Sequence, residues 1–114
     1  SLTLLGRGSV VINTGGEKVF PEEVEEALKT YPGVRDAVAV GVPDDKFGEV
    51  VAAIVEVAPT ESVDPAELTA HVRGKLAAYK APKQVFVIDT IGRAPNGKVD
   101  YKRLKAYAAS AQAS

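Results

Sequence analysis

Two nearly unbroken apolar runs constrain the fold of this chain more than any other feature. The first lies within Val34–Val42, where Ala37-Val38-Ala39-Val40 has no polar member, and the second spans Val50–Val57. Strands with one face in water alternate apolar and polar residues, whereas strands buried on both faces lose that alternation. The two runs therefore predict neighbouring central strands of a sheet that carries packed elements on its faces.

A first helix is predicted from Pro21 to Tyr31, ahead of the first apolar run. Proline suits the first helical position, and the acids that follow it suit the first turn. Pro32-Gly33 ends the helix. Its apolar side chains fall on one stripe, which consists of Val24, Ala27, Leu28 and Tyr31.

A second helix begins after Asp64, because Asp64-Pro65-Ala66-Glu67 combines a capping acid, a proline and a first-turn glutamate. Its inner stripe is Leu68, Val72 and Leu76. A short basic helix is expected from about Tyr101 to Ala108, and residues 109–114 are expected to form a frayed tail.

The remaining segments supply further strands. Turn residues at Asn13–Gly16 predict a hairpin that returns through Lys18-Val19-Phe20, and Gln84–Ile88 predicts another main strand. The 114 residues are then one α+β domain, with a small mixed β-sheet, a β-hairpin and about three helices packed on the sheet.

Charge and composition exclude several classes of function. A net charge of −1 offers no basic face for nucleic acid, and no apolar run is long enough for a transmembrane segment. The absence of cysteine and the single histidine argue against a metal site. With no signal peptide, a cytoplasmic location is expected. The chain begins without Met, which suggests a fragment or a processed chain.

Lys98 is the leading candidate for chemistry from the residues alone. Pro95, Asn96 and Gly97 predict a tight turn that would hold this lysine at a defined point, where its ammonium suits a phosphate or a developing oxyanion. A solvated surface lysine is the plainer interpretation. Lys98 is not part of a P-loop, because Val99 follows it and the upstream glycine is misplaced.

Three other segments have two interpretations each. Gly15-Gly16-Glu17 is either a plain hairpin turn or a loop that another molecule approaches closely. Arg7, between two glycines, is either a surface cation or a fork for a carboxylate, phosphate or sugar hydroxyl. His71 is either a half-buried packing residue of the second helix, which is the expectation, or a functional side chain.

Taken together, three ordered motifs resemble the adenylate-forming (ANL) superfamily of acyl-CoA synthetases, peptide-synthetase adenylation domains and luciferases. The motifs are GRGSVVINTGGEKVFPEEVE, GVPDDKFGEVV and YKAPKQVFVIDTIGRAPNGKV, and the resemblance extends from about Leu5 to Leu104. It concerns only the small C-terminal domain of those enzymes, the AMP-binding enzyme C-terminal domain. The first motif is most similar to actinobacterial fatty-acyl-CoA ligases of the FadD type.

The resemblance implies a reaction in two halves. A carboxylate, expected to be a fatty acid or a similarly apolar acid, attacks ATP to give acyl-adenylate and pyrophosphate, and the CoA thiol then displaces AMP. Lys98 matches the catalytic lysine that contacts the carboxylate and the α-phosphate. Arg7 matches an arginine near the nucleotide ribose. Gly15, Gly16 and Glu17 match the loop that lines the pantetheine tunnel after the domain rotates.

Two positions depart from the pattern of the superfamily. Ser9 stands where the hinge residue is commonly aspartate or lysine, so it lacks a charge that could bias one domain orientation. Gly92 stands where a proline often precedes the matching arginine, Arg93.

The resemblance also implies partners outside this chain. The partner of this domain would be its own N-terminal domain, which would bind Mg²⁺ with ATP and hold the acyl pocket, so the fragment alone is expected to be inactive. Peripheral contact with a membrane is left open.

Two alternatives to a CoA ligase share these features. One is an adenylation domain that loads a carrier protein, which an assay of thiol acceptors would distinguish. The other is a stand-alone binding or regulatory module on the same scaffold, since a fold does not fix a function. Such a module would not need both Lys98 and the Gly15-Gly16 loop.

Overall fold

The two apolar runs form the central hairpin of the sheet. The structure is a computed structural model that describes residues 11–113. Strand β3 (Val34–Asp44) pairs antiparallel with β4 (Gly48–Val57), and Ala39 lies opposite Ala53 in the register. Side chains on both faces of this hairpin are buried, as the missing alternation predicts.

The sheet is mixed, as expected. Strand β5 (Gln84–Ile88) runs parallel to β4, whereas β1 (Ile12–Thr14) pairs antiparallel with β2 (Glu17–Val19). Thr14 also bridges to Gly48 at the start of β4, which gives the order β2-β1-β4-β3 with β5 beside β4. The predicted hairpin and the predicted strand at Gln84–Ile88 are thus confirmed.

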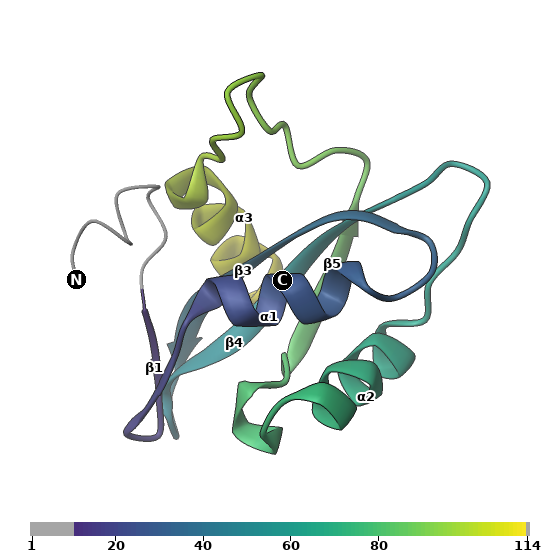
Figure 1. The fold of residues 1–114 in the computed structure, drawn as a ribbon. Helices are drawn as coiled ribbons and strands as arrows, with labels where there is room; N and C mark the ends of the chain where they lie inside the picture. Colours follow the sequence, from purple (N-terminus) through teal and green to yellow (C-terminus); the bar gives the residue numbers. More distant parts are fainter. Residues whose placement is uncertain (1–10, 114) are drawn as a thin grey trace.

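Helices cover the two faces of the sheet (Figure 1). On one face α1 (Pro21–Lys29) and α2 (Pro65–Lys75) bury their apolar stripes against the odd-numbered residues of β3 and β4. On the other face α3 (Tyr101–Ala113) packs Leu104 and Ala108 against the even-numbered residues. A short 3₁₀ turn (Ala78–Lys80) leads into β5.

Both predicted helix starts are confirmed by their capping contacts. The Asp64 carboxylate accepts a hydrogen bond from the Ala66 N–H at 2.9 Å, and Pro65 occupies the first turn of α2. At α1, the Glu23 carboxylate accepts from the Phe20 N–H at 3.4 Å, which satisfies a donor just before Pro21.

The structure corrects the expected end of the chain. Residues 109–114 were expected to be a frayed tail, but α3 continues to Ala113. The reason is tertiary: the Gln112 side-chain amide donates to the Pro43 carbonyl at 2.7 Å and its oxygen accepts from Gln84. Bonds to β3 and β5 therefore hold a segment whose composition alone suggested disorder.

Candidate functional site

Lys98 lies on the loop between β5 and α3, and local hydrogen bonds fix the conformation of the loop around it. The Gly97 N–H donates to the Ala94 carbonyl at 2.8 Å, and the Ala94 N–H donates to the Lys98 carbonyl at 2.9 Å. The Asn96 side chain accepts from the Lys98 N–H at 3.1 Å. Gly97 has φ of +86°, a conformation that favours glycine. The tight turn predicted from Pro95-Asn96-Gly97 is therefore present.

Buried side chains anchor this loop on both sides of Lys98. Ile91 is fully buried and Val99 nearly so, and both belong to the core under α3. The Ile91 N–H donates to the Glu56 carboxylate at 2.8 Å, and Arg103 donates to the Ile91 carbonyl at 2.8 Å. The Lys98 side chain itself is exposed and forms no ion pair within residues 11–113. A free ammonium thus projects from a firmly held backbone.

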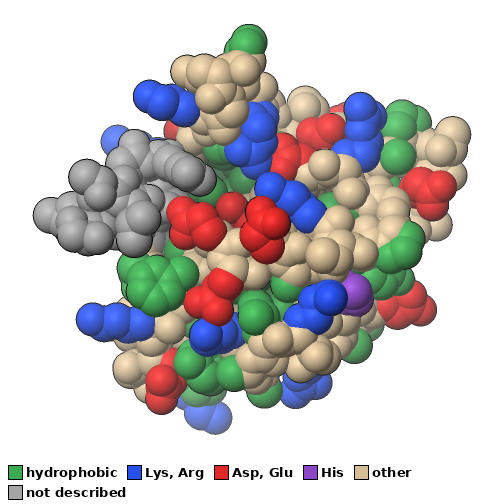
Figure 2. Space-filling model, viewed as in Figure 1, with side chains coloured by type: hydrophobic (Ala, Val, Ile, Leu, Met, Phe, Trp, Pro, Cys, Tyr) green, Lys and Arg blue, Asp and Glu red, His purple; other side chains and the backbone are tan. Residues whose placement is uncertain are grey.

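A groove of about 440 Å³ separates this loop from α1. The groove is lined by acidic residues of α1 and by the basic residues Lys29, Arg93 and Lys98. Figure 2 shows acidic and basic side chains interleaved over the face that α1 occupies. The groove carries charges of both signs, so Lys98 faces a polar surface rather than an apolar pocket.

Glu25 is the buried acid at the floor of the groove. Its carboxylate accepts from the Ala39 N–H at 3.0 Å and from the Tyr101 hydroxyl at 2.7 Å, which links α1 to β3 and α3. Burial raises the pKa of the Glu25 carboxyl, although both hydrogen bonds oppose that shift. Burial and the bond to Glu25 also raise the pKa of the Tyr101 hydroxyl.

The Gly15-Gly16 segment is the turn of the β1–β2 hairpin. Both glycines have positive φ, +60° and +88°, as a two-residue type I′ turn requires. The Gly15 N–H donates to the Phe47 carbonyl at 2.9 Å, and a Cβ on Gly15 would lie 3.1 Å from the Phe47 ring. A Cβ on Gly16 would meet no atom within 4 Å, so its backbone is open to an approaching molecule. Glu17, which follows, is exposed.

The structure does not bring the two candidate segments together. The Lys98 loop and the Gly15-Gly16 turn lie at opposite ends of the molecule (Figure 1). Arg7 and Ser9 lie outside the described residues. His71 is half-buried, as expected, with Nε2 2.7 Å from the Thr30 hydroxyl and its ring edge-on to Tyr31.

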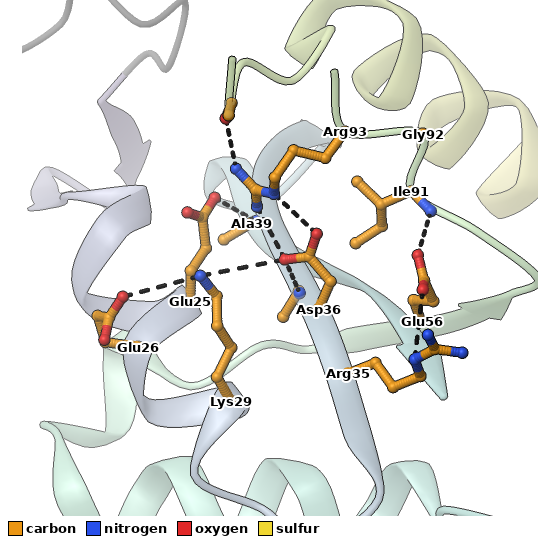
Figure 3. A network of polar contacts seen from close by, with 12 residues as sticks. Glu25, Glu26, Lys29, Arg35, Asp36, Ala39, Glu56, Ile91, Gly92 and Arg93 are labelled. Atoms are coloured by element: carbon orange, nitrogen blue, oxygen red, sulfur yellow. Dashed lines mark hydrogen bonds and ion pairs between the residues drawn. The ribbon is translucent and has the colours of Figure 1, made fainter. Parts of the chain in front are cut away.

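Sequence reasoning missed Asp36 and assigned no role to Arg93. Arg93 donates to the Asp36 carboxylate from Nε and Nη2, both at 2.8 Å, and to the Gly97 carbonyl from Nη1 at 2.8 Å (Figure 3). The position of Arg93 within the Lys98 motif was an available signal. Nothing in the sequence around Asp36 identifies its distant partner.

The described residues offer neither a metal site nor a membrane-spanning helix. Residues 11–113 contain no group of three or more His, Cys, Asp or Glu side chains that could hold a metal ion. Within that range, no helix is long and apolar enough to cross a bilayer.

Known proteins of one family resemble this chain in sequence. Residues 23–98 match the family model of the AMP-binding enzyme C-terminal domain. A medium/long-chain-fatty-acid and 3-oxocholest-4-en-26-oate CoA ligase of Mycolicibacterium smegmatis is 56% identical over 107 residues, which are 92% of this chain and 19% of that protein. A 3-oxocholest-4-en-26-oate CoA ligase of Rhodococcus rhodochrous is 54% identical over 105 residues, again 92% of this chain and 19% of the relative.

Solved structures agree with the sequence matches. A fatty acyl-CoA synthetase of Mycobacterium tuberculosis superposes with a TM-score of 0.81 and 36% identity, over 89% of this chain and 20% of that one. This chain therefore spans about a fifth of the length of the relatives it matches. The matched motifs, the mixed sheet and the three covering helices have one common explanation: the chain belongs to the AMP-binding enzyme C-terminal domain family.

Proposed function

We propose that this chain is the C-terminal domain of an ATP-dependent acyl-CoA synthetase and that Lys98 is its catalytic lysine for adenylation. One observation carries the proposal: within the family match, an exposed ammonium that has no ion-pair partner among residues 11–113 stands on a loop fixed on both sides by buried residues. A preorganised cation of this kind stabilises charge that develops during phosphoryl transfer.

The separation of the two candidate segments supports a division of labour. Lys98 and the Gly15-Gly16 turn lie at opposite ends of the domain, so they cannot face one reaction centre at the same time (Figure 1). Lys98 would face ATP and the carboxylate during adenylation. After the domain rotates, the Gly15-Gly16-Glu17 segment would face the pantetheine arm of CoA, with Arg7 near the ribose and Ser9 at the hinge.

The acid is proposed to be a fatty acid or a similarly apolar carboxylic acid, because the relatives named above are ligases of fatty acids and of a sterol-derived acid. ATP and CoA are the other substrates. Mg²⁺ would accompany ATP and be held by the N-terminal domain. The same names favour CoA over a carrier protein as the acceptor. A cytoplasmic location would suit these substrates.

Replacement of Lys98 tests the proposal in the full-length enzyme. Lys98→Ala should slow single-turnover formation of acyl-adenylate by about 1000-fold, since one electrostatic contact to the transition state is lost. Thioester formation from preformed acyl-adenylate should stay within about threefold, because Lys98 is then turned away from the reacting atoms. Lys102→Ala, which removes an exposed lysine from α3, is the matched control. Equal loss of both half-reactions would contradict the proposal.

A further inference from the structure

One arginine connects the Lys98 turn to the central sheet. The Arg93 guanidinium bonds to both carboxylate oxygens of Asp36 through Nε and Nη2, each at 2.8 Å, and reaches the Gly97 carbonyl with Nη1 at 2.8 Å. Figure 3 shows Arg93 between Asp36 on β3 and the loop. Because Gly97 directly precedes Lys98, the contact acts on the peptide unit that sets the direction of the lysine.

Asp36 is a firm anchor for this contact. It lies where the pairing of β3 with β4 shifts register, between Val34 and Asp36, and its side chain is only 17% exposed. One of its carboxylate oxygens also accepts from the Ala37 N–H at 2.8 Å. Burial acts to raise the pKa of Asp36, but the bonds from Arg93 and Ala37 and the charge of Arg93 outweigh it and lower the pKa. The carboxylate therefore stays charged near neutral pH.

Only a guanidinium can make these contacts at once. Its planar fork presents parallel N–H groups to the carboxylate and still has a donor for the Gly97 carbonyl, whereas a lysine ammonium is a single point charge. Lysine could retain an ion pair with Asp36, yet it would not hold the carboxylate in two-point contact together with Gly97. The residue type thus suits control of orientation more than charge pairing alone.

We propose that Arg93 is a positioning residue for adenylation and that it holds Lys98 in its productive direction through the Gly97 carbonyl, with Asp36 as its anchor. The inference rests on the proposed function, because it requires that Lys98 act in adenylation. Arg93 itself does not need to touch substrate. A displacement of about 1 Å in a catalytic group can cost on the order of 100-fold in rate.

Single-turnover assays of the full-length enzyme test this role. Arg93→Ala should slow acyl-adenylate formation by about 100-fold and leave thioester formation from acyl-adenylate within about threefold. Arg93→Lys should restore thermal stability while adenylation remains about 10-fold slow. Asp36→Asn should resemble Arg93→Lys in rate. Arg35→Ala is the matched control. Arg35 directly precedes Asp36 and forms an ion pair with Glu56 at 3.9 Å, but within residues 11–113 it forms no ion pair with the Lys98 turn.

A double variant separates positioning from any independent effect. If Arg93 acts through Lys98, then Arg93→Ala combined with Lys98→Ala should adenylate no more slowly than Lys98→Ala alone. Multiplied losses would overturn the inference, as would equal loss of both half-reactions in Arg93→Ala. If Lys98→Ala slows adenylation but Arg93→Ala does not, the inference fails while the proposed function stands. If Lys98→Ala leaves adenylation intact, the proposed function itself fails.

Discussion

The two ends of this domain are built in different ways. The Lys98 loop is held by side chains, which include the buried Ile91, the Glu56 carboxylate and the Arg93 fork. The Gly15-Gly16 turn is defined mainly by its backbone, with two positive φ angles and a hydrogen bond from Gly15 to the Phe47 carbonyl, although the Phe47 ring also lies close to Gly15. A cation must be aimed at one point, which requires a rigid support. A segment that receives another molecule benefits from bare backbone. The construction of each end therefore fits the role proposed for it.

Apart from the losses expected for the Lys98 and Arg93 variants, the largest effect is expected from a side chain placed on the bare turn. Gly16→Asn should fold, because asparagine tolerates positive φ better than most residues. In the full-length enzyme it should slow thioester formation from acyl-adenylate by about 100-fold and leave adenylation within about twofold. Single-turnover assays of each half-reaction measure this.

Gly48→Asn provides the control for that experiment. Gly48 also has positive φ, +84°, and an added Cβ would meet no atom within 4 Å, but it is the first residue of β4 and pairs with Thr14 of β1. If Gly16→Asn and Gly48→Asn behave alike, the Gly15-Gly16 segment is only a hairpin turn and the contrast between the two ends disappears.

A smaller effect is expected at Glu25, on the side-chain-supported end. Glu25→Ala should lower the free energy of unfolding by about 2 kcal/mol, since the Ala39 N–H and the Tyr101 hydroxyl lose their partner. Glu25→Gln should instead be more stable than the wild type at pH 7, because the raised pKa of Glu25 means that ionisation of this carboxyl opposes folding.

The pH dependence of that second variant follows from the sign of the shift. Protonation favours the folded wild type, so the advantage of Glu25→Gln should disappear as the pH falls below the ordinary carboxyl value of 4.5. Urea unfolding at pH 7 and pH 4 measures it. An advantage that is independent of pH would refute the assignment.

The smallest effect concerns stability rather than rate at Arg93. Arg93→Ala should cost about 1 kcal/mol at pH 7, as expected for a partly exposed ion pair. Asp36 has a lowered pKa, so the stabilisation is present above its ordinary value of 3.8 and is lost as the pH falls through the folded value. The wild type and Arg93→Ala should then converge in urea unfolding near pH 2. If Arg93→Ala lowers the free energy of unfolding by several kcal/mol at pH 7, the main role of Arg93 is to stabilise the fold rather than to position Lys98.

Local patterns predicted the elements well, because each depends on residues close in sequence. The apolar runs, the prolines at both helix starts and the Asn13–Gly16 turn identified β3, β4, α1, α2 and the first hairpin. The predicted end of α3 was wrong, because the Gln112 side chain donates a hydrogen bond to the Pro43 carbonyl, 69 residues away in the sequence. Asp36 was missed for the same reason: its partner Arg93 is 57 residues distant. Periodicity carries no information on such contacts. Lys98 could be singled out from the sequence because its turn residues adjoin it, and its catalytic role stays a prediction.

The bond from Ala39 to Glu25 has a consequence for solubility. β3 is the last strand of the described sheet on its side, and its stretch Ala37–Val42 is uncharged, free of proline and rich in β-branched residues. Such a segment on an open edge invites a strand from another chain and cross-β growth. Here the outward N–H groups of Ala37 and Ala39 are already bound to the carboxylates of Asp36 and Glu25. The acids that support the Lys98 end thus also leave two fewer free donors on this edge for a strand from another chain.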